Sequence, residues 1–256
     1  MLHQFITYLK WLPKTIHLHG IHSPFVFQLE KNCLRQPLSK NTQTQFKTYK
    51  KKLAQDQRTI TVTDFGSGSR VFKSNNRKVR HIARYAGASL KRMGILHSLS
   101  SYTKAKTILE LGTSLGTGTL ALATPHTTTI TTLEGCPATA AVAKQYLKEA
   151  RCTTINSIVG AFDQTIKDLI SQSFDLIYFD GNHDKEATLD YVHQLLSTVH
   201  NDTIWIFDDI HWSAGMSEAW EVIKNLPQIT VSIDSFWSGS VFFRKERNKQ
   251  NLCIRM

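Results

Sequence analysis

The stretch Thr107-Ile-Leu-Glu-Leu-Gly-Thr-Ser-Leu-Gly-Thr-Gly-Thr-Leu-Ala-Leu-Ala123 decides how the rest of the chain is interpreted. It begins as an apolar run, passes through Gly112, Gly116 and Gly118, and resumes as a helical pattern from Leu120. A strand, a glycine turn and a helix N-terminus form a place where backbone can approach a nucleotide closely. The stretch therefore predicts a nucleotide-type cofactor site, and its spacing has to indicate which cofactor.

From residue 105 on, short apolar runs alternate with helical patterns, which is typical of a parallel α/β sheet. The predicted strands are 107–111, 128–134, 154–159, 174–180 and 203–208, with helices at about 117–124, 137–150, 162–171, 184–199 and 215–225. A last pair of strands, 228–236 and 240–245, turns at Trp237-Ser-Gly-Ser240 as an antiparallel hairpin. We therefore expect a Rossmann-like, seven-stranded, mostly parallel sheet in residues 101–256.

Residues 1–100 predict an N-terminal helical cap with a basic region. Apolar side chains at helical spacing run over residues 2–12 up to Pro13, and Ser23-Pro24 has the form of a helix start. Residues 40–60 predict a helix or a mobile arm, and further helices follow from Lys78. His17, His19 and His22 lack a helical metal-ligand spacing, so turn or pocket positions are preferred. The glycine stretch Asp64–Ser69 is either a loop that closes over a ligand or a plain connection.

The composition limits the cellular setting. No apolar run approaches the roughly 20 residues that span a bilayer, and the N-terminus lacks the pattern of a signal peptide. The four cysteines, Cys33, Cys136, Cys152 and Cys253, have no metal or redox spacing, so the expected location is the reducing cytoplasm. The formal charge of +11 is concentrated before residue 93 and indicates either an anionic partner or a solvated basic face.

The spacing of the glycine loop excludes the common nucleotides. The G-x-G-x-x-G fingerprint of NAD sites is absent, and no Lys follows the glycines as a P-loop requires. A cofactor that approaches the backbone but carries no phosphate fits better, namely S-adenosylmethionine. Its amino-acid end would lie at the loop that starts with Glu110, and the predicted contacts there are Gly112, Thr113, Ser114, Gly116 and Gly118.

Two further strand ends extend the predicted cofactor site. Glu134 and Gly135 follow the second strand, where a carboxylate can accept both ribose hydroxyls. Gly160, Ala161 and Phe162 follow the third strand, where they can flank an adenine.

The segments ILELGTSLGTGTLALA, TLEGCP, FDLIYFDGNH and IFDDIHW together resemble the class I S-adenosylmethionine-dependent methyltransferases. Within that class they are most similar to O-methyltransferases with a D-G-x-H motif and a paired D-D motif. The segments GIHSPFVF and VFFRKE also resemble a bacterial methyltransferase family of Bacteroidetes type.

Three carboxylates close the fourth and fifth strands: Asp180, Asp208 and Asp209. They meet at one edge of a parallel sheet, and a hard cation such as Mg²⁺, or another divalent cation, would relieve their repulsion. The resemblance implies the same three residues as metal ligands and His183 as the base that takes the acceptor's proton. Asp180 can instead contact only the cofactor, and His183 can instead cap a helix. His211 is a competing base, or a pocket wall with Trp212.

Two functions follow from these patterns. The first is metal-assisted O-methylation of a small hydroxyl-bearing acceptor, anionic if the basic field serves it, with Phe25, Phe27, Trp212 and Trp237 as pocket walls or core. The second is methylation of RNA or protein through the basic N-terminal region; it is not favoured, because no N/D-P-P-Y motif is present. A non-enzymatic binding module is disfavoured by the intact acidic set. The sequence leaves the oligomeric state open, although the small-molecule methyltransferases that it resembles are frequently homodimers, and it does not name the acceptor.

Overall fold

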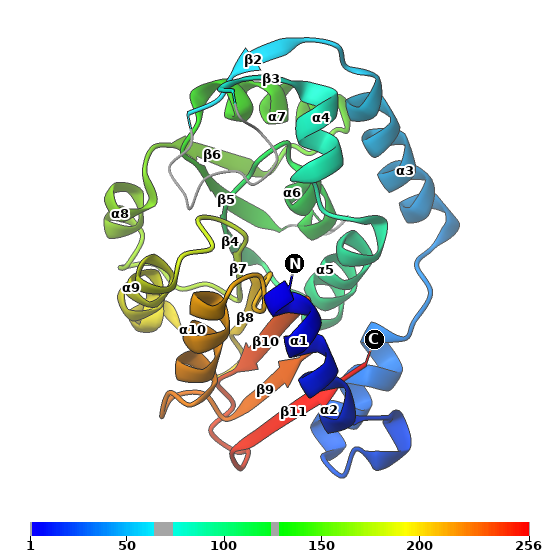
Figure 1. Cartoon of the computed structure of the whole chain (residues 1–256), viewed down its shortest axis with the longest axis vertical. Helices are drawn as coiled ribbons and strands as arrows, with labels where there is room; N and C mark the ends of the chain where they lie inside the picture. The colour runs from blue at the N-terminus through cyan, green and yellow to red at the C-terminus, as the bar shows by residue number, and fades with distance from the viewer. Residues whose placement is uncertain (1, 64–73, 124–127, 256) are drawn as a thin grey trace. The chain divides into compact units, whose positions relative to one another are not determined.

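The computed structural model describes residues 2–63, 74–123 and 128–255, so the predicted loop Asp64–Ser69 lies outside the described residues. The chain divides into two compact units (Figure 1). Unit 1 comprises residues 1–35 and 166–256, and unit 2 comprises residues 36–165. The boundary near residue 100 that the sequence suggests stays a prediction.

Unit 2 contains the glycine loop of residues 107–123, with the strand before the loop and the helix after it. Its parallel strands are β4 (Thr107–Leu111), β5 (Thr129–Glu134) and β6 (Ile155–Val159), in the order β4-β5-β6. Helix α6 (Thr117–Leu122) follows β4, α7 (Pro137–Glu149) connects β5 to β6, and α8 (Phe162–Thr165) follows β6. Because neighbouring strands are parallel, the loops after β4, β5 and β6 all leave the same edge.

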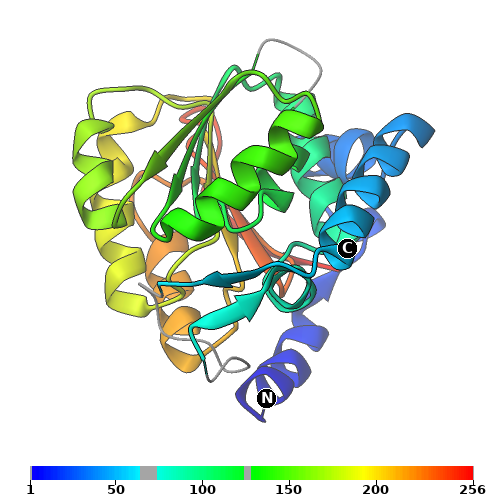
Figure 2. The same cartoon turned by 90° about the horizontal axis from the view of Figure 1, so that it is seen from above.

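The first part of unit 2 is mainly helical. The long helix α3 (Lys40–Gln55) packs against α4 (Val79–Tyr85), α5 (Leu90–Thr103) and α6. The region 40–60 is therefore a helix for most of its length, which confirms one of the two expectations for it. The short strands β2 (Thr59–Thr61) and β3 (Asn76–Lys78) form a separate antiparallel ribbon, drawn in cyan in Figure 2, that the sequence does not predict.

Unit 1 holds six strands in the order β1-β11-β9-β10-β8-β7. The strands are β1 (Thr15–Ile16), β7 (Leu176–Phe179), β8 (Ile204–Asp208), β9 (Val231–Asp234), β10 (Ser238–Phe242) and β11 (Gln250–Ile254). Strands β7 and β8 are parallel, and β10 runs antiparallel to both β8 and β9. All five residues of β8 are buried, which agrees with the continuous apolar run that predicted this strand.

The expected α/β architecture with a mostly parallel sheet is confirmed, but two details of the prediction are wrong. Among the described residues, the strand order contains nine strands rather than seven, not counting the β2–β3 ribbon. The predicted hairpin exists as β9 and β10, yet the sheet does not end there, since β11 pairs in parallel with β9 and β1 pairs with β11. Strand β1 has only two residues, and β11 mixes polar with apolar side chains, so neither has a clear period.

The helices of unit 1 are α1 (Leu2–Trp11), α2 (Pro24–Leu29), α9 (Lys185–Leu195) and α10 (Ala214–Lys224), with α9 and α10 in contact. Helix α2 starts after Ser23 with Pro24 at its first position, as predicted. Helix α1 packs through Tyr8 and Trp11, whose rings lie 4.9 and 5.5 Å from the ring of Phe236. None of the helices of residues 2–63, 74–123 and 128–255 is both long and apolar enough for a bilayer crossing.

A tight contact between β10 and α10 gives a test of this packing. A Cβ added to Gly239 would lie 2.5 Å from Cη2 and Cζ3 of the buried Trp220 ring. We expect Gly239→Ala to lower the free energy of unfolding by about 1–3 kcal/mol, because overpacking forces the ring or the strand to move. Urea unfolding measures this change. The control is Gly20→Ala, whose Cβ would meet Ile16 at an ordinary 3.8 Å; equal stability of both variants would contradict the packing described.

Candidate functional site

The loop after β4 is fixed to the neighbouring strand β5. The backbone N–H groups of Gly112 and Thr113 donate to the carbonyl of Leu133, at 2.9 and 3.1 Å. The carboxylate of Glu134 accepts the N–H of Ser114 at 2.7 Å through Oε2 and the N–H of Cys136 at 2.9 Å through Oε1. Both oxygens of Glu134 therefore help to hold the loop after β4 and the start of α7 in place.

Glu110 lies on β4 and is completely buried. Its Oε2 accepts the hydroxyls of Thr119 at 2.5 Å and Thr132 at 2.6 Å, while its Oε1 is buried without a hydrogen-bond partner among the described residues. Burial raises the pKa of this carboxyl to about 7, because desolvation penalises the charged form more than the two hydroxyls stabilise it. A buried, half-satisfied acid of this kind is typical of functional sites.

Gly116 serves the packing of unit 2. It precedes α6 with a φ of 75°, in the left-handed region, and a Cβ there would lie 2.8 Å from the hydroxyl of Tyr49 and 3.0 Å from Leu147. The same Tyr49 hydroxyl donates to the carbonyl of Leu115 at 2.8 Å. Tyr49 therefore holds the glycine loop from α3, a role that nothing in its sequence position indicates.

The predicted cofactor residues of unit 2 surround the carboxyl edge of its three parallel strands. The N–H of Gly160 donates to the carbonyl of Glu134 at 3.0 Å, which ties the ends of β6 and β5 together. The positions are one residue of β4 (Glu110), its loop and helix (Gly112, Thr113, Ser114, Gly116, Gly118), the end of β5 (Glu134, Gly135) and the end of β6 (Gly160, Ala161, Phe162). Asp180, the remaining predicted cofactor residue, belongs to unit 1.

The strand ends of unit 1 contain unusual backbone. Asn182, His183 and Asp209 have positive φ values of 67°, 33° and 50°. Non-glycine residues adopt this region at a cost and cluster at functional sites. His183 Nε2 lies 3.8 Å from Oδ1 of Asp180, and both side chains are partly exposed. The following Asp184 caps α9 through the N–H of Ala187, so His183 is not the residue that caps this helix by its side chain.

The three expected metal ligands do not fit a metal ion as they are arranged. Asp208 is buried and accepts the hydroxyl of Tyr178 at 3.3 Å, whereas Asp180 and Asp209 are half-buried. Among the residues that the structure describes, no group of three or more His, Cys, Asp or Glu side chains has the geometry to hold a metal. His17, His19 and His22 are among the described residues and likewise belong to no such group.

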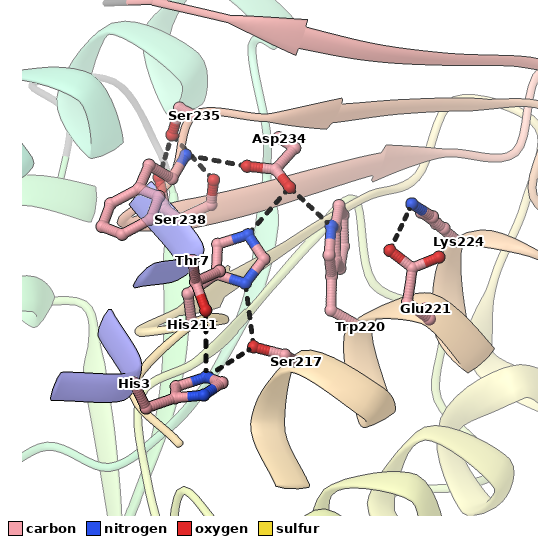
Figure 3. A network of polar contacts seen from close by, with 11 residues as sticks. His3, Thr7, His211, Ser217, Trp220, Glu221, Lys224, Asp234, Ser235 and Ser238 are labelled. Carbon is pink, nitrogen blue, oxygen red and sulfur yellow. Dashed lines mark hydrogen bonds and ion pairs between the residues drawn. The ribbon is translucent and has the colours of Figure 1, made fainter. Parts of the chain in front are cut away.

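His211 is the centre of a polar network in unit 1 (Figure 3). Its Nε2 lies 3.0 Å from Asp234 Oδ2, and its Nδ1 lies 3.0 Å from the hydroxyl of Ser217. Asp234 also accepts the indole N–H of Trp220, and Ser217 lies 3.2 Å from Nε2 of His3 on α1. Since a carboxylate only accepts, His211 donates from Nε2 to Asp234.

The contacts of His211 in this network are not predictable from the sequence. Both ring nitrogens of His211 already have partners and the residue is 8% exposed, which favours His183 over His211 as the base. Asp234 lies 23 residues after His211, and no pattern connects the two.

Of the four predicted wall residues, Phe25 packs edge-on against Phe242, and Trp237 is 51% exposed.

Comparison with known proteins adds to this geometry. Residues 109–210 match the family model of a methyltransferase domain. A SAH-bound methyltransferase of Podospora anserina is similar with a TM-score of 0.60 and 16% identity, over 88% of this chain and 98% of that one. An O-methyltransferase of Bacillus cereus in complex with SAH has a TM-score of 0.56 and 16% identity, over 88% and 100%.

A third solved structure is the O-methyltransferase TomG of Streptomyces achromogenes, in complex with SAM. It has a TM-score of 0.55 and 18% identity, over 62% of this chain and 82% of that one. No curated protein sequence is significantly similar to the chain. The domain match agrees with the resemblance to methyltransferases, and the solved structures show that the chain shares their fold. Its narrower assignment to a D-G-x-H and D-D group stays a prediction.

The buried Glu110 predicts a specific pH dependence of stability. In the unfolded chain this carboxyl ionises near its ordinary pKa of about 4.3, but in the fold it stays protonated up to about pH 7. Stability is therefore lost as the pH rises from about 5 to 7, by up to about 3 kcal/mol. Glu110→Gln keeps an acceptor for Thr119 and Thr132 but cannot ionise. We expect it to gain stability relative to the wild type between pH 5 and pH 8.

Urea unfolding at pH 5 and pH 8 measures the difference in stability between Glu110→Gln and the wild type. Titratable groups that the two proteins share contribute equally to both and cancel in this difference. Asp163→Asn, at an exposed position of the same unit, is the control and should leave the pH dependence unchanged. A constant difference between Glu110→Gln and the wild type would show that Glu110 is ionised in the fold.

Proposed function

We propose that the protein is an S-adenosylmethionine-dependent methyltransferase that methylates a hydroxyl group of a small molecule. The observation that carries the proposal is the loop after β4, which Glu134 fixes beside the buried Glu110. This loop lies within the stretch that matches a methyltransferase domain. Three O-methyltransferase or methyltransferase structures with the same fold, two of them SAH-bound and one in complex with SAM, support the reaction class.

The residues of unit 2 fit S-adenosylmethionine. The buried Oε1 of Glu110, which has no hydrogen-bond partner among the described residues, suits a cationic amino group, directly or through water. Glu134, at the end of β5, is an acceptor suited to ribose hydroxyls, and Gly160, Ala161 and Phe162 suit the adenine. When bound, S-adenosylmethionine supplies a methyl group on a positively charged sulfur, which an oxygen nucleophile can attack.

The residues of unit 1 are assigned to the acceptor. His183 would hold the hydroxyl proton of the acceptor at Nε2, and Asp180, 3.8 Å away, stabilises the resulting charged ring. His183 has a φ of 33°, a backbone conformation that clusters at functional sites, and alignment of the acceptor is the main contribution of the protein. His211 belongs to the Asp234 network and orients the segment around it.

Metal assistance, the more specific form of the sequence prediction, has no support from the side chains. Asp180, Asp208 and Asp209 do not form a metal-holding group, so no step is derived through Mg²⁺. Loss of methyl transfer in EDTA that added Mg²⁺ restores would return the metal to the reaction. A cytoplasmic location, a homodimer and an anionic acceptor likewise stay predictions.

Activity profiling tests the proposal. Incubation of the purified protein with tritium-labelled S-adenosylmethionine and a metabolite extract is expected to give labelled small molecules. The label should stay on these molecules under alkaline conditions that hydrolyse esters, because methyl ethers resist base. Label that appears only in precipitated RNA or protein would instead support the alternative acceptor classes, and absence of any labelled product in repeated extracts would contradict the proposal.

The role of His183 gives a sharper prediction. We expect His183→Ala to lower the rate of methyl transfer about 10²–10⁴-fold with little change in cofactor binding, as is typical for loss of a general base. His193→Ala, on the exposed side of α9, is the matched control and should keep its rate. A His183→Ala variant with a normal rate from pH 6 to 9 would remove this residue from the reaction.

A further inference from the structure

The net positive charge of the chain comes from unit 2. This unit holds 19 of the 31 Lys and Arg residues and 6 of the 20 Asp and Glu residues, whereas unit 1 holds 12 and 14. The formal charges are therefore +13 for unit 2 and −2 for unit 1. The asymmetry is strongest in residues 36–106, where 16 cationic side chains accompany two acids. An excess of this size makes the surface of this segment attractive to anions.

Helix α3 arranges part of this charge in a stripe. Lys40, Lys47 and Lys51 are separated by seven and four residues, so they lie on one side of the helix, and all three are exposed. The stripe extends over about 16 Å of helix axis. The buried side chains of α3, namely Phe46, Tyr49 and Leu53, lie on the opposite side.

The stripe does not serve the stability of the helix. No acidic residue occurs in α3, and no ion pair among the described residues involves Lys40, Lys47 or Lys51. Like charges four residues apart, such as Lys47 and Lys51, destabilise a helix by about 0.2–0.5 kcal/mol. The neighbouring Lys50 and Lys52 differ, since they bond to the carbonyl of Ala88 and to Glu149. The stripe is therefore unneutralised charge that the packing of unit 2 does not require.

Helix α4, which packs against α3, adds aromatic side chains to this charge. Arg84 lies over the ring of Tyr85 at 5.5 Å, and Tyr85 is 54% exposed. Arg84 and His81 are exposed as well. Exposed aromatic rings among cations provide surfaces on which unpaired bases stack.

We propose that the exposed residues of α3 and α4 described above, here called the basic face, bind single-stranded nucleic acid. Its members are the lysine stripe (Lys40, Lys47, Lys51) and the aromatic site of Arg84 and Tyr85. The length of the stripe favours a chain of phosphates over a small anion, which would occupy one or two lysines. A bilayer surface is less suitable, because the exposed ring is a tyrosine paired with arginine rather than a cluster of aliphatic side chains. The proposal does not depend on the methyl transfer reaction.

Fluorescence anisotropy of the full chain with labelled U20 and dT20 from 50 to 200 mM salt tests the basic face. Three phosphate contacts predict a slope of about −2 for log K against log salt. Lys47→Gln/Lys51→Gln should weaken binding to both probes and reduce the slope by about 1.4, because two contacts are lost. Lysine and glutamine have similar helix propensities, so α3 should stay folded.

The matched control removes the same charge from unit 1. Lys167→Gln/Lys245→Gln changes two exposed lysines of unit 1 and should leave the slope unchanged. Tyr85→Ala should weaken binding at least about fivefold at constant slope, and Tyr85→Phe should retain it. A slope near zero, equal losses in both lysine pairs, or tighter binding to phosphatidylglycerol vesicles than to either oligonucleotide would overturn the proposal.

Discussion

The attachment of the loop after β4 to strand β5 is the constraint on which the candidate cofactor site depends. Glu134 accepts N–H groups from Ser114 and Cys136, and Leu133 accepts those of Gly112 and Thr113. These bonds fix the backbone at the carboxyl edge of the three parallel strands. The buried Glu110 beneath the loop is the cost of this arrangement, since its carboxyl is desolvated and only half satisfied.

Continuous apolar runs made the central strands predictable. Strands β4, β5, β7 and β8 are buried almost throughout, so their residues show little alternation and stand out from their surroundings. Strands β1, β2, β3 and β11 have two to five residues and partly exposed side chains. Such strands exist because a neighbour offers hydrogen bonds, and a sequence pattern does not contain that information.

The residues of the candidate site also fall into two groups, those that the sequence pattern indicates and those that it does not. Glu110, Glu134, Asp180 and His183 could be proposed from the sequence because each lies at or near the end of a predicted strand with a glycine nearby. The partners that define their chemistry lie elsewhere in the sequence. Thr119 and Thr132 hold Glu110, and Asp234 holds His211 from another strand. The strand ends and the family resemblance also predicted a metal on three carboxylates, but the described side chains form no group that could hold one.

The central claim is that the loop between β4 and α6 binds S-adenosylmethionine. Isothermal titration calorimetry of the purified protein with S-adenosylmethionine, NAD and ATP in turn tests this claim most directly. The account predicts saturable 1:1 binding of S-adenosylmethionine and no measurable heat of binding for NAD or ATP at the same concentrations. Binding of NAD or ATP in the absence of any binding of S-adenosylmethionine would contradict it.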